Sequence, residues 1–218
     1  MIKKILLCLS IYCFNEHAFS QNLYEKGNHY LDVNIAFGGN KVYTQLSDEL
    51  NKTNSINISL PALTYEYGLL NEIGVGMQVQ DNHYFSKKIP TYLSSTTFLI
   101  NNNLHYIKKE NFDFIVGIGY GLGIYKAKDR EFKYISNGSG FAYNIYIASR
   151  FILSEKLTIN AKMLWNDESY KMTHLNFNTI EYQLNKNSDY YTYLKGIHLS
   201  FGITFNLKKA LLRGKKQK

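Results

Sequence analysis

Cysteine is almost absent from the chain. Its only two cysteines, Cys8 and Cys13, lie within the first 20 residues. If this segment is removed on export, the remaining chain has neither disulfides nor thiolate metal sites. The chain also lacks an apolar run long enough for a membrane-spanning helix, which needs about 20 residues. These two absences exclude disulfide-stapled scaffolds and helical membrane proteins.

Acidic residues are also in short supply, with 17 against 25 basic residues and a formal net charge of +8. The excess is concentrated in residues 208–218, which contain six basic residues and no acidic one, and residues 1–20 contribute one further positive charge. The chain between them is close to neutral, so its charge does not point to nucleic acid. The basic tail is either a solvated end or a segment that contacts anionic lipid headgroups.

Residues 1–20 have the pattern of a secretory signal peptide. Lys3 and Lys4 precede a short apolar run, and the small residues Ala18 and Ser20 stand at the −3 and −1 positions of a cleavage site. A short buried N-terminal helix is the alternative interpretation. The signal pattern predicts cleavage after Ser20 and export of the remaining chain.

The strongest pattern in the chain lies in residues 112–124, where every even position is large and apolar. The odd positions carry Asp113, Ile115 and four glycines, at 117, 119, 121 and 123. A period of two is typical of a β-strand, and four glycines would strongly weaken a helix. A face with almost no side chains suits the crowded interior of a small barrel with lipid outside. We expect these glycines to make room for bulky neighbours such as Tyr146 and Arg150.

The same alternation divides the exported chain into eight segments, each suited to a tilted crossing of about ten residues. In the second segment the apolar positions change from even to odd at Pro61. Proline cannot donate to a strand ladder, so this change predicts a β-bulge at Pro61. The eight segments are residues 30–37, 56–67, 73–80, 92–106, 112–124, 141–153, 157–168 and 193–207.

Short and long connections alternate between these segments. The connections after the second, fourth and sixth segments are tight, and those after the first, third, fifth and seventh are long and polar, at about residues 38–55, 81–91, 126–140 and 169–191. Outer-membrane barrels have this topology, with short turns in the periplasm and long loops outside. The sequence therefore predicts an all-β, eight-stranded antiparallel up-and-down transmembrane β-barrel over residues 21–207. It would follow the signal peptide and precede a basic periplasmic tail.

Aromatic residues collect at both ends of the predicted strands. Amphipathic rings gather in this way at the two interfaces of a membrane. The positions that we expect to form the aromatic girdles are Tyr65, Tyr67, Phe112, Phe114, Tyr143, Trp165 and Phe205.

The chain resembles the small eight-stranded outer-membrane barrels of the OmpX and OmpA-barrel type, and the outer-membrane β-barrel domain family common in Bacteroidota. The resemblance covers the whole exported chain and rests on strand pattern and topology. The last segment is similar to the family's C-terminal assembly signal, with alternating apolar residues up to Phe205. The resemblance implies a place in the bacterial cell outer membrane, surrounded by lipid and lipopolysaccharide, and assembly by the barrel-assembly machinery. It implies no cofactor.

The interior of an eight-stranded barrel is just wide enough for its own side chains. Buried charges must pair, so Glu66 and Asp113 are expected to pair with Arg150 and Lys162. The alternative to such a packed plug is a narrow proton or solute path. The residues predicted to form this structural interior network are Asp32, Glu66, Asp113, Arg150, Lys162 and His198.

One short motif suggests an enzyme. His198 and Ser200 match the His-x-Ser pair of outer-membrane lipid A deacylases, which resemble this chain in size and fold. Those enzymes take a carboxylate from a later strand, and no Asp or Glu follows Ser200. The histidines of the chain also show no spacing typical of metal ligands. We therefore expect no enzymatic activity, no catalytic residue and no metal site.

Three functional hypotheses remain. The first is a structural or surface-recognition protein whose long polar loops bind an envelope protein or a host-surface ligand. The second is a subunit of an envelope or secretion assembly that acts through the periplasmic turns and tail. The third is a narrow solute channel. None of them involves nucleic acid.

Overall fold

The computed structural model describes residues 24–46, 49–85, 91–109, 111–129, 134–154, 157–177, 180–183 and 190–207. The predicted signal peptide and basic tail lie outside these residues. No helix in the described ranges is long and apolar enough to cross a membrane. The strands are β1 (His29–Leu46), β2 (Glu49–Gly68), β3 (Ile73–Phe85), β4 (Thr91–Lys109), β5 (Phe112–Asp129), β6 (Tyr134–Ser154), β7 (Leu157–Phe177), β8 (Ile180–Gln183) and β9 (Tyr191–Asn206).

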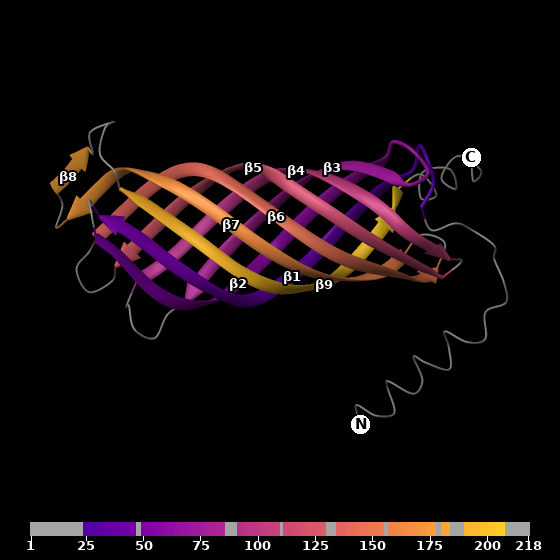
Figure 1. The fold of residues 1–218 in the computed structure, drawn as a ribbon, viewed down its shortest axis with the longest axis horizontal. Coiled ribbons are helices and arrows are strands. Elements are labelled where there is room, and N and C mark those ends of the chain that lie inside the picture. The colour runs from indigo at the N-terminus through magenta and orange to yellow at the C-terminus, as the bar shows by residue number, and fades with distance from the viewer. Residues whose placement is uncertain are drawn as a thin grey trace, which may run out of the picture.

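The strands form one antiparallel sheet that closes on itself (Figure 1). Neighbours follow the order β6-β5-β4-β3-β2-β1-β9-β7, and β6 also pairs with β7. Eight strands therefore form a ring, and β8 adds a short hairpin to the end of β7. This confirms the predicted eight-stranded antiparallel up-and-down barrel. Closure pairs the edge strands with each other, so the ring itself has no free edge.

Large apolar side chains point outward around the ring, and polar side chains point inward. On β5, Ile118 and Leu122 are 45% and 64% exposed, whereas Asp113 on the opposite face is fully buried. The alternation predicted for residues 112–124 is confirmed, because consecutive strand residues point to opposite faces of the sheet. Along this part of the barrel the arrangement is the reverse of that in a water-soluble protein.

The glycines on the inner face of β5 accommodate bulky side chains from neighbouring strands. The ring of Tyr146, which is the register partner of Gly117 on β6, fills the space where a Gly117 side chain would be. The ring of Tyr170 fills the space beside Gly123 in the same way. The expectation that these glycines make room for Tyr146 is confirmed. The same expectation is wrong for Arg150, which is not among the nearest neighbours of any of these glycines and lies opposite Asp113 in the register.

The β-bulge predicted at Pro61 is confirmed. The register of β2 shifts between Ser59 and Ala62 in its pairing with β3, and β1 shows the matching shift between Asn34 and Ala36. The extra residue of the bulge offsets the change from even to odd apolar positions, so that apolar residues on both sides of Pro61 point outward.

The expected long loops are mostly strand, and that prediction is wrong. The β1–β2 ladder continues to the Leu46–Glu49 pair, and β5 and β6 remain paired as far as Asp129. β7 runs to Phe177 and then pairs with β8, which lies at one end of the barrel in Figure 1. We call this the hairpin end. The opposite, short-turn end has the tight connections that the sequence predicted after β2, β4 and β6.

The interior of the hairpin end is an apolar and aromatic core. The rings of Tyr125 and Tyr170 stack, with 5.5 Å between their centroids. A core of this kind is typical of a protein surrounded by water. The buried residues of this group, here called the upper core, are Val42, Tyr84, Leu93, Tyr125, Ala127, Tyr170, Met172 and Leu194.

Candidate functional site

Charged side chains converge inside the short-turn end of the barrel. The up-and-down topology brings the beginnings of β1, β5 and β7 to the same end as the ends of β2, β4 and β6. Each of these strands contributes one charged or titratable inward residue, and all of them are buried. This lower cluster consists of Asp32, Glu66, His105, Asp113, Arg150 and Lys162.

Arg150 is the central cation of the lower cluster. Its Nη2 atom lies 2.6 Å from Glu66 Oε2 and 3.3 Å from Asp32 Oδ2. Lys162 Nζ lies 2.8 Å from the same Asp32 Oδ2 atom. Two cations therefore hold two carboxylates that come from other strands of the ring. Removing one partner from such a buried pair is far more destabilising than breaking an exposed pair.

His105 connects Glu66 to the third carboxylate of the cluster, Asp113. Its Nδ1 atom lies 2.7 Å from Asp113 Oδ2, and its Nε2 atom lies 2.8 Å from Glu66 Oε1. Only the imidazolium form can donate from both ring nitrogens. In that form three cationic groups balance the three carboxylates of the cluster. Asp113 thus pairs with His105. The sequence-based hypothesis, in which Asp113 pairs with Arg150 or Lys162, is wrong on this point.

Tyr24 covers the cluster from the short-turn end. Its ring stacks on His105 with 3.3 Å between centroids, and its side chain is 1% exposed. Gly27, at φ 78°, turns the segment, and its N–H donates to the Gly68 carbonyl at 2.7 Å. Burial, reinforced by the charge of Glu66, raises the pKa of the Tyr24 hydroxyl far above its ordinary value. Tyr24 is therefore a neutral cap on the lower cluster.

His198 lies apart from the lower cluster. Asn166 Nδ2 donates to its Nδ1 atom, and its Nε2 atom donates to Asn40 Oδ1, both at 3.0 Å. His198 and Ser200 are 1% and 3% exposed and point into the barrel, as the alternation predicted. The His-x-Ser pair is therefore turned away from the surrounding lipid.

Glu168 forms a second polar group at the base of the upper core. Its carboxylate accepts hydrogen bonds from Ser95 Oγ at 2.8 Å, from Tyr170 Oη at 2.7 Å and from Tyr84 Oη at 3.1 Å. Asn82 Nδ2 donates to it at 3.3 Å. Among the described residues no cation lies within ion-pair distance of Glu168, so neutral donors alone satisfy it.

The sequence reasoning missed Tyr24 and Glu168 as members of interior groups. It placed His105 on the inner face but left it out of the charged network. His105 had an inward position and stood eight residues before Asp113 across a tight turn. For Glu168, the signal was its even-numbered, inward position at the last residue of the segment predicted for residues 157–168. No such signal exists for Tyr24, because it precedes the first strand. Within the described ranges, no group of three or more His, Cys, Asp or Glu side chains is arranged to hold a metal ion.

The outside of the barrel is an apolar belt bordered by aromatic rings. Trp165 and Tyr143 pack edge to face at the hairpin end, with 5.8 Å between their centroids. Phe112 lies beside Phe151 at the short-turn end, with 5.0 Å between centroids. The other expected girdle residues also lie on outward positions: Tyr65, Tyr67, Phe114 and Phe205.

A closed ring with an apolar outside, aromatic borders and a polar inside is suited to lipid and not to water. The protein is a transmembrane β-barrel of the outer-membrane type. Barrels of this type lie in the bacterial outer membrane, with their short turns in the periplasm. The short-turn end of this barrel is accordingly assigned to the periplasm, and the hairpin end to the outside of the cell.

No protein-family model and no curated protein matches the barrel. Among solved structures, it is similar to the outer membrane protein AlkL, studied in lipid bilayers (15% identity, 88% of this chain and 96% of that chain, TM-score 0.49). It is also similar to OprG from Pseudomonas aeruginosa (12%, 84% and 96%, TM-score 0.48) and to the outer membrane protease OmpT from Escherichia coli (10%, 85% and 98%, TM-score 0.48). These identities carry no information about what the present barrel binds or catalyses.

Proposed function

We propose that this outer-membrane barrel is a non-enzymatic surface protein that recognises its ligand through the hairpins at its extracellular end. The observation that carries the proposal is that strand pairing and a buried core continue well beyond the aromatic girdle. β7 continues twelve residues past Trp165, to Phe177. At about 3.3 Å per residue and a tilt of about 40°, this extension rises about 30 Å above the girdle.

The raised end is built as a rigid support. The upper core fills its interior, and Glu168 ties Tyr84, Ser95 and Tyr170 together. Its outer surface carries lysine and tyrosine side chains, including Lys126, Lys128 and Tyr193. Residues that bind partners are commonly presented by loops on such a rigid scaffold. The partner class that we propose is an envelope protein or a host-surface ligand.

The same packing argues against a channel. The lower cluster and Tyr24 fill the periplasmic end, and the upper core with Glu168 fills the extracellular end. We expect purified barrels in a planar lipid bilayer to produce no stepwise conductance in molar salt, because neither end offers a continuous polar path. Heat-denatured protein in the same detergent serves as the control. Reproducible steps that scale with salt concentration would overturn this part of the proposal.

The recognition hypothesis is tested with three barrels immobilised in lipid nanodiscs. They are the full chain, a variant in which Asn-Gly replaces residues 174–190, and a variant lacking residues 208–218. Extracts of the cell envelope and of host-cell surfaces are passed over each. We expect a specific ligand to bind the full chain and the tail-deleted chain but not the hairpin-deleted chain.

The opposite pattern would support the alternative that the protein is an assembly subunit acting on the periplasmic side. In that case binding would survive removal of residues 174–190 and be lost with residues 208–218. Folding of each variant is checked first by the gel shift between heated and unheated samples.

A further inference from the structure

A basic group stands on the outer wall of the barrel just above the apolar belt. Lys41 on β1 and Lys195 on β9 are register partners, and both are exposed. The outward position that follows Lys195 toward the periplasm is Ile197, which is 60% exposed and belongs to the belt. The two ammonium groups therefore stand where the belt gives way to the headgroup layer on the extracellular side.

These two lysines retain the capacity to bind an anion. Lys195 Nζ lies 2.8 Å from Asp167 Oδ2. This contact uses one of the three N–H donors of the Lys195 ammonium group. Asp167 is itself 7% exposed and also accepts a hydrogen bond from Tyr143 Oη at 2.9 Å. Lys41 has no ion pair among the described residues. Like charges directly opposite each other on adjacent strands are destabilising unless an anion lies between them.

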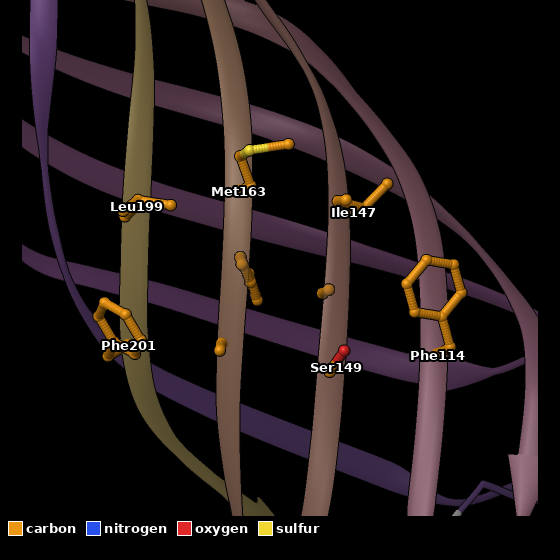
Figure 2. A pocket seen from close by; sticks show the side chains of 9 residues that line it. Phe114, Ile147, Ser149, Met163, Leu199 and Phe201 are labelled. Carbon is orange, nitrogen blue, oxygen red and sulfur yellow. The ribbon is translucent and has the colours of Figure 1, made fainter.

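An apolar groove lies lower on the same side of the barrel. Ser149 on β6 and Ala161 on β7 are register partners, and as small outward residues they leave the wall hollowed. Phe114 on β5 and Phe201 on β9 continue the same row on either side. Figure 2 shows the two rings flanking the hollow, which has a volume of about 200 Å³.

The upper border of the groove is apolar as well. It is formed by Ile147, Met163 and Leu199, which Figure 2 shows in a row above the two rings. Two of the lining residues are polar, Ser149 and Lys162, and Lys162 directs its ammonium group into the barrel, where Nζ lies 2.8 Å from Asp32 Oδ2. The Ser149 hydroxyl is therefore the polar group on the outward side of the lining. The groove therefore suits a hydrocarbon chain.

The groove and the lysines are separated by the depth of one leaflet. Lys195, Ile197, Leu199 and Phe201 are successive outward residues of β9. Six residues span about 20 Å along a strand, and a tilt of about 40° reduces this to about 15 Å of depth. The hydrocarbon core of a bilayer is about 30 Å thick, so one leaflet is also about 15 Å deep.

We propose that the outer wall from β1 across β9, β7 and β6 to Phe114 on β5 binds one phosphorylated lipid of the outer leaflet. The phosphate accepts hydrogen bonds from Lys41 and Lys195. One acyl chain runs along β9 and ends in the groove between Phe114 and Phe201. This lipid site lies on the wall of the barrel and is independent of the recognition proposed for the hairpins.

Trp165 provides the measurement, because it is the only tryptophan of the chain and pairs in register with Ile197 beside the path of the acyl chain. The full-length barrel is reconstituted in phosphatidylcholine vesicles. Equal mole fractions of phosphatidic acid or phosphatidylcholine with brominated chains are then introduced. We expect brominated phosphatidic acid to quench Trp165 fluorescence at a lower mole fraction than brominated phosphatidylcholine.

Lys41→Gln is expected to weaken the association of phosphatidic acid about fivefold, the effect of one lysine near a charged surface. Lys126→Gln is the matched control, because Lys126 is an exposed lysine on β5 that lies twelve residues along the strand from Phe114 and does not line the groove. It should leave the quenching curve unchanged. Equal quenching by the two lipids, or equal losses in the two lysine variants, would overturn the proposal.

The groove is tested separately with Ala161→Phe, which fills the hollow and leaves the lysines in place. We expect this variant to require a several-fold higher mole fraction of phosphatidic acid for the same quenching, whereas Ile118→Phe, at an outward position of β5 that does not line the groove, should not. An unchanged curve for a folded Ala161→Phe barrel would overturn the placement of the acyl chain.

Two further measurements distinguish the occupant of the site. Inorganic phosphate should not compete with phosphatidic acid, and full competition by it would show a site for free anions instead. Quenching that falls as the protein-to-lipid ratio rises would show that a second copy occupies the groove, which would also overturn the proposal.

Discussion

Replacing Arg150 with alanine is expected to lower the free energy of unfolding by about 3–5 kcal/mol, as for removal of one partner from a buried ion pair. Arg150 Nη2 contacts both Glu66 and Asp32 inside the barrel. Without it, the two carboxylates face each other with fewer cations and no access to water. When samples are heated to increasing temperatures before electrophoresis, the band of the folded barrel should therefore disappear at a clearly lower temperature than for the wild type.

The matched control for Arg150→Ala is Glu72→Gln, which breaks the Glu72–Lys108 pair at the short-turn end. That pair spans 3.3 Å, and its Glu72 side chain is 61% exposed. Exposed pairs contribute about 1 kcal/mol or less, so the transition should barely move. An Arg150→Ala barrel that unfolds at the same temperature as the wild type would contradict a structural role for the lower cluster.

The second large effect is expected from Gly117→Val. The Tyr146 ring fills the space beside Gly117, and its hydroxyl donates to Asn103 Oδ1. Lys162 Nζ also lies 5.7 Å from the centre of the same ring. A valine side chain would displace the ring from these contacts. Overpacking of this kind costs about 1–3 kcal/mol and occasionally more, and we expect a lower yield of folded barrel on refolding into detergent.

Gly39→Val is the control for this substitution. Gly39 is exposed on β1, and nothing lies within 4 Å of the position that its Cβ would occupy. Since valine is favoured over glycine in strands, this variant should refold as well as the wild type or better. Equal losses in the two variants would mean that the lack of a side chain at Gly117 serves something other than the packing of Tyr146.

The predictions of strand position came from local information and were accurate where the belt is apolar. The alternation in residues 112–124 and the change of phase at Pro61 both follow from the period of two residues along a strand. The long loops were predicted wrongly for a related reason. Beyond the membrane, the outward side chains of β1 or β7 face water, so polar residues replace apolar ones while the strand continues.

For the candidate site, the sequence predicted which charged strand residues face the interior, but not how they pair. The alternation alone places Glu66, Asp113 and Arg150 on the inner face. Asp113 nevertheless bonds to His105, because the partners of a buried charge depend on which strand ends meet inside the ring. Glu168 was missed although it ends the predicted segment 157–168 on an inward position, because the neutral donors that satisfy it come from β3, from β4 and from the part of β7 beyond that segment.

For this protein, the sequence by itself determined which face of the barrel each strand residue occupies, because that depends only on position within one strand. Only the tertiary structure decided which residues meet across the lumen and at what depth each one lies. Those relations depend on the register and tilt of all eight strands after the ring has closed, and they brought together the lower cluster, the upper core and the groove below Lys41 and Lys195.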